Sequence, residues 1–392
     1  MRHQGVHARL REVCIIGASS NCLNILHVLR APVGGLFRHV MDLAGGQAAR
    51  GHRVGVIVDA STGGSRADAV LAQLSPCLAL GVTRVPMSRQ IGRKDVAAVA
   101  HVGRRAAAAA ADVLHGHGAK GGAYARLARG ARAIRVYTPH GGSLHYRWGS
   151  PTGLLYLTLE RLLIARTDLF LFESAYGRDV FRSKLADPGQ SARVVHNGVA
   201  PAEFEPIVTD PQAADLVFVG ELRRLKGVDV LIQAIALIKQ DGLSLRATIV
   251  GDGPDRAAFE AQVRTQGLAE SVQFVGAKPA RRAFAAGRLL VIPSRAESLP
   301  YVVLEAVAAG VPLITTNVGG IPEIFGPYSA DLVSPGDPQA LARAIGLALG
   351  DLAGQRAAGT RLQARVRASF STQVMTEAVL AAYGEALARQ HG

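Results

Sequence analysis

The chain has 392 residues, of which 49% are hydrophobic and 19% charged, so it is too long for one ordinary core and predicts two domains. Its three cysteines, Cys14, Cys22 and Cys77, form no C-x-x-C pair, which argues against a disulfide scaffold or a structural zinc site. No apolar run reaches the roughly 18 residues of a membrane-spanning helix, and the first residues lack the apolar core of a signal peptide. We therefore expect a cytoplasmic protein.

The net charge of +14 lies entirely in the first half of the chain. Residues 1–200 contain 26 Lys or Arg and 11 Asp or Glu, a balance of +15, whereas residues 201–392 balance at −1. Few aromatic residues lie among these arginines and no helix-turn-helix or zinc spacing occurs, so nucleic acid is not an expected partner. An anionic membrane surface or a phosphate-bearing acceptor fits better. The alternative is a basic surface that is merely solvated.

Strand-like apolar runs alternate with helix-like segments along the chain, a pattern typical of doubly wound parallel α/β sheets. The expected strands are 23–29, 53–59, 112–117, 133–140, 168–174, 214–220, 245–251, 271–276, 288–294 and 311–316. A nearly all-apolar helix at 154–165, LLYLTLERLLIA, is expected to pack in a core rather than to anchor at a membrane. Two similar α/β halves follow from this pattern.

The proline-containing stretch between the two halves predicts a linker. We expect five segments: a tail at 1–22, an N-terminal domain at 23–197, the linker at 198–213, a C-terminal domain at 214–371 and a final helix at 372–392. The final helix could pack back towards the N-terminal domain. The segment CIIGASS (14–20) hints at a dinucleotide fingerprint but lacks G-x-G-x-x-G, which disfavours a nicotinamide-dependent oxidoreductase.

Two carboxylates stand eight positions apart in ESLPYVVLEAVAAG, residues 297–310. Pro300 suits a first helical position, so Glu297 is expected in a loop and Glu305 on a helix that stops at Gly310. Eight residues of helix would separate the two by about 12 Å, whereas glycoside hydrolase pairs need roughly 5 to 9.5 Å. The helix amino end, around Tyr301 and Val302, instead favours a phosphate, flanked by carboxylates that bind hydroxyl groups. A sugar nucleotide has these groups in this order.

This stretch, with the G-V-P and V-G-G-I-P-E that follow, resembles the E-x7-E signature of retaining glycosyltransferase family 4. The resemblance implies the GT-B fold, in which two Rossmann-like α/β domains face each other across a cleft. It implies that Glu305 binds the ribose of the donor, that Glu297 contacts the transferred sugar as a catalytic residue, and that Tyr301 and Val302 lie beside the diphosphate.

Other segments resemble the same family. FVGELRRLKG (218–227) is similar to G-R-L-x-x-x-K-G, which implies that Lys226 clamps the diphosphate. The family arginine falls on Glu221, so Arg223 or Arg224 is expected to supply its charge, and Glu221 to point away or bind an arginine. SVQFVGAKP (271–279) implies that the nucleotide base lies against Val275 to Ala277.

The N-terminal half carries matching segments. Gly34 and Gly35, after the first strand, would let backbone approach a phosphate. VYTPHGGSL (136–144) is similar to T-P-H-G, which makes His140 the expected contact to the sugar or leaving phosphate, with a histidine satisfied by backbone as the alternative. His115 and His117 form H-x-H, but no third ligand has suitable spacing, so they are read as cleft-wall or structural residues. HNGV (196–199) and FESAYGRDVF (172–181) also resemble segments of this family, but we predict no site residue from either.

The resemblance implies transfer of a hexose-type sugar, with retention, from a UDP- or GDP-sugar to a saccharide or polyprenyl-linked acceptor. Bacterial cell-surface or exported polysaccharide synthesis, at the inner face of the cytoplasmic membrane, is the expected setting. No D-x-D motif occurs, so no divalent metal and no cofactor are implied. An epimerase or phosphorylase of the same fold, or a sugar-nucleotide binding protein without activity, are the alternatives.

Overall fold

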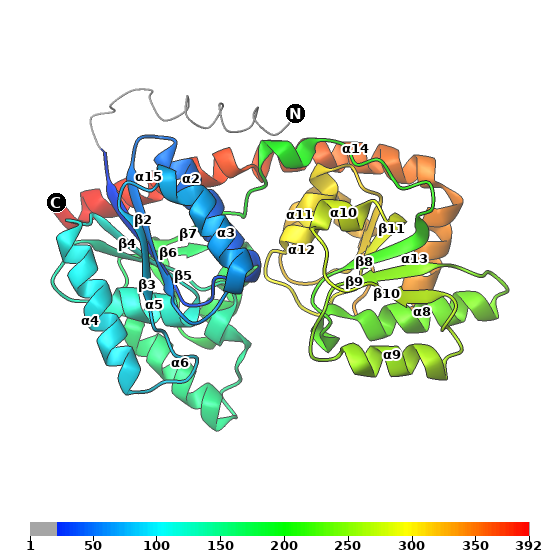
Figure 1. Cartoon of the computed structure of the whole chain (residues 1–392), viewed down its shortest axis with the longest axis horizontal. Coiled ribbons are helices and arrows are strands. Elements are labelled where there is room, and N and C mark those ends of the chain that lie inside the picture. Colours follow the sequence, from blue (N-terminus) through cyan, green and yellow to red (C-terminus); the bar gives the residue numbers. More distant parts are fainter. Residues whose placement is uncertain (1–21, 392) are drawn as a thin grey trace. The chain divides into compact units, whose positions relative to one another are not determined.

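The computed structural model describes residues 22–391, and the predicted tail and the CIIGASS segment lie largely outside them. The chain divides into two compact units, residues 1–198 with 372–392 and residues 199–371. Figure 1 labels most of the helices and strands of both units. Each unit is an α/β domain built on one parallel sheet.

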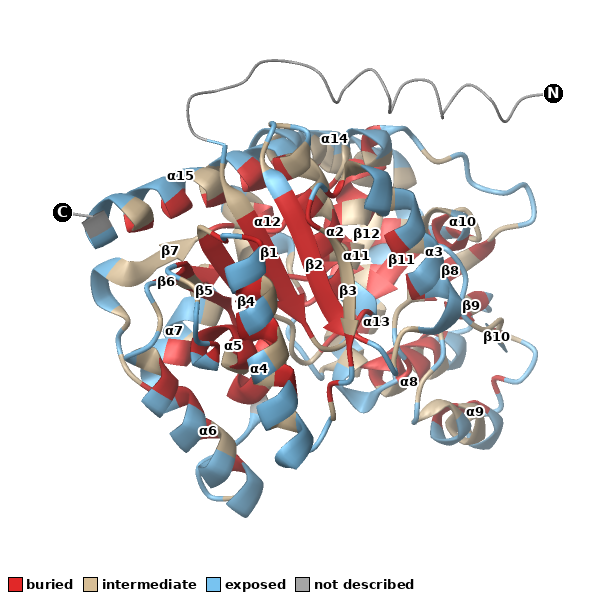
Figure 2. Cartoon of the chain, turned by 60° about the vertical axis from the view of Figure 1, so that its left-hand side comes forward, coloured by how far each residue is buried: buried red, intermediate tan, exposed pale blue. Residues whose placement is uncertain are grey.

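The first unit is built on a seven-stranded parallel sheet of order β3-β2-β1-β4-β5-β6-β7. Its strands are β1 (Asn24–Leu29), β2 (Arg53–Asp59), β3 (Gly81–Val85), β4 (Val113–His117), β5 (Ile134–Thr138), β6 (Leu169–Phe172) and β7 (Ala192–Val194). Its helices are α2 (Gly34–Ala48), α3 (Gly64–Leu74), α4 (Arg93–Ala108), α5 (Gly118–Leu127), α6 (Pro151–Ile164), α7 (Ala175–Lys184) and α15 (Thr372–His391). Figure 2 shows β1 and β2 almost wholly buried, which is why these strands read as continuous apolar runs.

The second unit has a five-stranded parallel sheet of order β10-β9-β8-β11-β12. Its strands are β8 (Ala214–Val219), β9 (Ala247–Val250), β10 (Val272–Phe274), β11 (Gly287–Ile292) and β12 (Leu313–Thr315). Its helices are α8 (Val228–Gln240), α9 (Arg256–Thr265), α10 (Ala280–Phe284), α11 (Tyr301–Ala308), α12 (Ile321–Phe325), α13 (Pro338–Gly350) and α14 (Leu352–Ser369). In both sheets the order reverses beside the first strand, between β1 and β4 and between β8 and β11. Ligands of open α/β sheets bind at such points.

The ten predicted strands all form, whereas β3 and β7 had not been predicted. The residues that join the units also carry structure. Pro201–Phe204 form a short 3-10 helix whose Phe204 packs into the core of the second unit. The final helix, α15, packs against α2 of the first unit.

The apolar helix α6 differs from its expected burial. Leu157 and Leu163 face inward, but Leu154, Leu155 and Leu162 are 56%, 50% and 66% exposed. Leucine occurs all round this helix, so periodicity alone could not distinguish its inner face from its outer face. The prediction that α6 is a core helix is therefore wrong for half of its surface. No helix in the described part of the chain combines the length and apolar character needed to cross a bilayer.

Candidate functional site

Two predicted site residues are in contact in the loops that follow β8 and β11. These loops lie at the switch point of the second sheet, where the strand order reverses. Lys226 Nζ lies 2.7 Å from Glu297 Oε1 and 2.9 Å from Oε2. Ser294 Oγ also donates to Glu297 Oε1, at 2.7 Å. The Glu297 side chain is only 8% exposed, so this carboxylate needs its ammonium and hydroxyl partners. The family motifs at 218–227 and 297–310 therefore form one ionic unit.

An arginine that the sequence did not point to ties these two loops together. Arg295 binds both Asp229 carboxylate oxygens, at 2.6 and 2.7 Å, and donates to the Arg224 carbonyl at 2.7 Å. The hydrogen bonds to Asp229 raise the pKa of Arg295 above its ordinary value. Arg295 thus fixes the loop that carries Lys226 to the start of α8, a role that only the fold reveals.

Two glycines of the family segments are required by close backbone contacts. Gly227 has φ +72°, and a Cβ there would lie 1.9 Å from the Pro293 carbonyl oxygen. Gly319, in V-G-G-I-P-E, has φ +59°, and its Cβ would lie 1.8 Å from the carbonyl oxygen of Glu297. Any side chain at either position would displace the loop that holds Glu297. The V-G-G segment is therefore a support for that loop.

Helix α11 begins at Tyr301, one residue later than predicted. Pro300 is the N-cap, with an extended ψ of 123°, and Tyr301 is the first helical residue. The prediction that Pro300 is the first helical residue is therefore wrong. The proline ring fixes φ at a helical value but leaves ψ free, and here ψ is extended. Tyr301 and Val302 contribute the first helical amides, and the half-buried Glu305 follows one turn later. Glu297 lies in the loop and Glu305 on the helix, as predicted.

Glu221, the residue that replaces the family arginine, binds an arginine as expected. Arg223 Nε lies 2.8 Å from Glu221 Oε1, and both side chains are about half exposed. Arg224 is 84% exposed, with its Nε 4.0 Å from Asp229. Arg223 thus neutralises Glu221, and Arg224 has the more accessible guanidinium.

The residues predicted to meet the nucleotide base follow the edge strand β10. The Val275 N–H donates to Ile249 within the sheet, at 3.1 Å. Ala277 is exposed. A base contact at Val275 would therefore have to use an atom other than its N–H group.

In the first unit, Gly34 and Gly35 are exposed at the start of α2, directly after β1, where the sequence placed them. His140, in contrast, is enclosed. Its Nδ1 lies 2.5 Å from Glu173 Oε2, its Nε2 lies 3.2 Å from His117 Nδ1, and its side chain is 7% exposed. Its φ of +50° is uncommon for a residue other than glycine and indicates local strain. Both ring nitrogens are thus already engaged in this structure.

His115 and His117 belong to a larger group of histidines. His115 is bonded to Tyr383 Oη at 2.7 Å and to Thr138 Oγ1 at 2.8 Å, which makes it structural. His117 has further histidines within metal-ligand distance, His27 in one set of three and His39 with His140 in another. Sequence spacing offered no third histidine beside H-x-H, whereas the fold brings His27, His39 and His140 close to His117.

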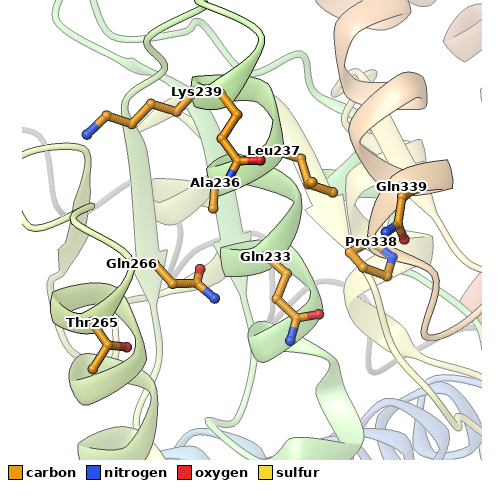
Figure 3. A pocket seen from close by; sticks show the side chains of 9 residues that line it. Gln233, Ala236, Leu237, Lys239, Thr265, Gln266, Pro338 and Gln339 are labelled. Atoms are coloured by element: carbon orange, nitrogen blue, oxygen red, sulfur yellow. The ribbon is translucent and has the colours of Figure 1, made fainter.

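A hollow on the second unit lies apart from these residues. It has a volume of about 710 Å³ and is lined by α8, the end of α9 and the start of α13 (Figure 3). Its polar lining residues are Gln233, Lys239, Gln240, Thr265, Gln266 and Gln339. None of the predicted site residues lines it, so it is not the site that the motifs indicate.

Two family models match the chain. "Glycosyltransferase Family 4" matches residues 33–203, and "Glycosyl transferases group 1" matches residues 213–351. Among curated proteins, a D-inositol 3-phosphate glycosyltransferase of Nocardia farcinica is 31% identical over 254 residues, covering 59% of this chain and 56% of that protein. TuaC of Bacillus subtilis, named for teichuronic acid biosynthesis, is 32% identical over 242 residues, 60% of each chain. The chain thus matches little more than half the length of these relatives.

Solved structures show the same fold over nearly the whole chain. HepE of Anabaena in complex with UDP and glucose aligns with a TM-score of 0.76 and 20% identity, covering 93% of this chain and all of HepE. A sucrose-phosphate synthase from Thermosynechococcus elongatus aligns with a TM-score of 0.76 and 22% identity, covering 94% and 100%. The predicted GT-B fold of two parallel-sheet α/β domains is confirmed. The chain belongs to glycosyltransferase family 4.

Proposed function

We propose that this protein transfers a sugar from a nucleoside diphosphate sugar to a saccharide or lipid-linked acceptor, with retention of the anomeric configuration. The contact between Lys226 and Glu297 at the switch point of the second sheet carries the proposal. It combines one charge suited to a diphosphate with one group suited to sugar hydroxyls. Solved HepE complexes with UDP and with UDP-glucose support a donor of this class.

The second unit would hold the donor through distinct groups. A Lys ammonium has three donors, so after two contacts to Glu297 the third remains for a diphosphate oxygen. Glu297 Oε1 accepts from both Lys226 and Ser294, whereas Oε2 accepts one bond from Lys226 and so keeps a lone pair for a sugar hydroxyl. The first amides of α11, at Tyr301 and Val302, would bind phosphate, and Glu305 the ribose hydroxyls.

The reaction needs stabilisation of the negative charge that grows on the diphosphate as the glycosidic bond breaks. Lys226, an arginine of the pair Arg223 and Arg224, and the amino end of α11 would supply it. Gly34 and Gly35 of the first unit would add backbone amides. With these groups in place, we propose that the donor diphosphate needs no divalent metal or cofactor. A UDP- or GDP-linked hexose is the proposed donor.

The acceptor side of the proposal rests on the first unit. A groove of about 340 Å³ lies beside α6, with a mainly apolar lining that includes Ile91, Val99 and Leu159. Its charged lining residues are Lys120, Arg166, Asp95 and Glu160, and Lys120 is paired with Asp95. Exposed leucines of α6 lie in the half of the chain that carries all the excess positive charge. An apolar surface in a basic half suits a polyprenyl phosphate acceptor at an anionic, cytoplasmic membrane face. Synthesis of a cell-surface or exported polysaccharide is the proposed setting.

Nucleotide release tests the proposal. Purified protein would be incubated with UDP- and GDP-sugars, with and without lipid-linked saccharides, with Lys226→Met as the control. Acceptor-dependent release of UDP or GDP, and a product whose anomeric configuration matches the donor, is the expected result. Release without an acceptor would indicate an epimerase or phosphorylase, and donor binding without turnover a binding protein. Thermal stabilisation by NAD alone would contradict the whole proposal.

A further inference from the structure

The mostly apolar helix α6 carries one carboxylate, Glu160, and it points inward. Its side chain is 5% exposed, and three side chains donate to it. Arg126 Nη2 lies 2.8 Å from Oε2, while Tyr137 Oη and Ser143 Oγ each lie 2.8 Å from Oε1. A buried carboxylate requires such partners, because it has lost its contacts with water. The donor loops of the second unit do not account for this group.

Arg126 holds Glu160 in one orientation. Arg126, on α5, is fully buried, its Nε donates to the Gly122 carbonyl at 3.0 Å, and its Cζ lies 3.8 Å from the centre of the Tyr137 ring. A planar guanidinium that is both stacked and hydrogen-bonded has a defined position. A buried ion pair is often no more stable than apolar side chains of the same volume, so stability alone does not explain this one. Glu160 is therefore a fixed acceptor inside the first unit.

One of the donors to Glu160 belongs to the loop that carries His140. Ser143 lies in the short 3-10 helix Gly142–His145, three residues after His140, and is 1% exposed. Tyr137, the other hydroxyl donor, lies within β5. The bond from Ser143 thus ties the loop after β5 to α6, whereas the bond from Tyr137 ties the strand itself.

The backbone of this loop has an uncommon conformation. His140, Gly141 and Gly142 have φ values of +50°, +74° and +29°, so three successive residues have positive φ. Glycine adopts such values readily, but histidine does so at a cost and keeps them only where the surrounding structure holds it. Thr138, the last residue of β5, precedes this turn, and Ser143 follows it. The turn is therefore held between the strand and the bond to α6.

We infer that Ser143 and Glu160 are positioning residues for His140. Their hydrogen bond keeps the left-handed turn in place, and with it the imidazole that is proposed to meet the sugar or the leaving phosphate. The inference rests on the proposed transfer reaction. Without this bond the His140 backbone can relax towards negative φ and carry the ring away from Glu173, its present partner. A displacement of about 1 Å at a reacting centre lowers a rate by about 100-fold.

Ser143→Ala and Tyr137→Phe form a matched pair of variants. Each removes one buried hydroxyl that donates to Glu160 Oε1 at 2.8 Å, and each leaves the other hydroxyl and Arg126 in place. We expect similar losses in melting temperature, but a fall in kcat of about 10- to 100-fold for Ser143→Ala alone. The KM for the donor should change little, because the second unit is proposed to bind it. Glu160→Gln is less informative, since Arg126 would be left buried without its counter-ion.

A double-mutant cycle tests whether Ser143 acts through His140. In a His140→Ala background, Ser143→Ala should lower kcat no further, because the effects of residues that act through one another do not add. The same fold-loss in both backgrounds would overturn the inference. Equal kcat values for Ser143→Ala and Tyr137→Phe would also overturn it, since the loss would then follow from stability alone.

Crystal structures of the two variants test the inference without an activity assay. We expect His140 to lose its positive φ or its contact with Glu173 in Ser143→Ala, and to keep both in Tyr137→Phe. An unchanged His140 in Ser143→Ala would overturn the inference even if the wild type transfers sugar. A wild type that transfers no sugar would instead overturn the proposed function, while these structures would still decide whether Ser143 holds the turn.

Discussion

Lys226 Nζ contacts both carboxylate oxygens of Glu297, a residue 71 positions later in the chain. The two belong to loops that follow β8 and β11, adjacent parallel strands whose carboxyl ends meet at the switch point. The ammonium and the carboxylate hold each other in place. The groups proposed to meet the diphosphate and the sugar thus restrict each other's motion, which would lower the ordering cost of binding the donor.

Replacement of Lys226 should affect both of its proposed partners. Lys226→Met removes the diphosphate contact and leaves Glu297, 8% exposed, without its cation. We expect UDP or GDP affinity to fall by about 1.5 to 3 kcal/mol, the scale of a hydrogen bond to a charged group, as measured by calorimetry. Lys239→Met is the control, because Lys239 Nζ donates to the Gly267 carbonyl on an exposed surface, apart from the predicted site residues. Unchanged nucleotide affinity in Lys226→Met would remove this lysine from the donor site.

Glu305 provides an independent test of nucleotide binding. Glu305→Ala should weaken binding of the nucleoside diphosphate by roughly 1.5 to 3 kcal/mol, because a ribose hydroxyl would lose a charged acceptor. The same measurement on the 2′,3′-dideoxy nucleotide should show little further loss, since that ligand cannot make the bond. Glu260→Ala, a surface residue paired with Arg256, is the control. Equal losses for both nucleotides would exclude the ribose role.

The loop that carries Glu297 should depend on Gly319. In Gly319→Ala the Cβ would lie 1.8 Å from the Glu297 carbonyl oxygen, whereas in Gly336→Ala the same left-handed φ meets open space. Gly336→Ala should therefore cost only the conformational penalty of about 1 to 2 kcal/mol, and Gly319→Ala clearly more. Thermal unfolding and nucleotide affinity measured on both variants would separate the cost of the left-handed φ from the cost of the close contact with the Glu297 carbonyl oxygen. Equal melting temperatures would show that the close contact does not matter.

The sequence predicted the fold because both sheets are buried and parallel. Their strands are continuous apolar runs, and all ten expected strands formed. β3 (GVTRV) and β7 (ARV) were not predicted, because each is a short edge strand and only half apolar. Their sequence patterns resemble those of loops. The outer face of α6 was wrongly predicted to be buried because the helix is apolar on all sides. Its apolar residues suggested burial, although Leu154, Leu155 and Leu162 are exposed among the described residues.

The site was predictable where a motif stands within one segment and not where separate segments meet. Glu297 in a loop and Glu305 on a helix followed from one proline. The pairing of Lys226 with Glu297, and the support from Arg295, depend on strand order, which spacing does not encode. For the same reason spacing could not show that His39 and His140 lie beside His117, because the packing of α2 and the loop after β5 brings them there.

The exposed face of α6 predicts salt-sensitive binding to membranes. The wild type should float with vesicles that contain anionic lipid, and less so as salt screens the attraction. Leu155→Glu with Leu162→Glu should lower flotation, because two apolar side chains that are 50% and 66% exposed would become anionic. Leu347→Glu, 77% exposed on the second unit, is the control. Equal flotation with neutral vesicles would contradict an electrostatic contact.

The buried histidines should make the first unit sensitive to acid. Burial lowers the pKa of His27 to about 4 and that of His39 to about 3, from an ordinary value of 6.5. Below pH 6.5 the unfolded chain therefore binds protons that the folded chain excludes. Stability is fully present above that pH and falls as the pH drops, by up to about 1.4 kcal/mol per pH unit for each histidine. The fall from His27 should level off near pH 4, where the folded form also takes up a proton.

Urea unfolding in EDTA at pH 8, 6.5 and 5 would measure this effect. The chain has one tryptophan, Trp148, which donates to the Lys184 carbonyl within the first unit, so its fluorescence reports on that unit alone. His39→Gln should reduce the pH dependence, because it removes one proton-binding difference between the folded and unfolded states. His101→Gln should leave the acid-induced loss of stability as in the wild type, since the side chain lies outside the cluster. A first unit that becomes more stable from pH 8 to 5 would show that these histidines are not held neutral by burial.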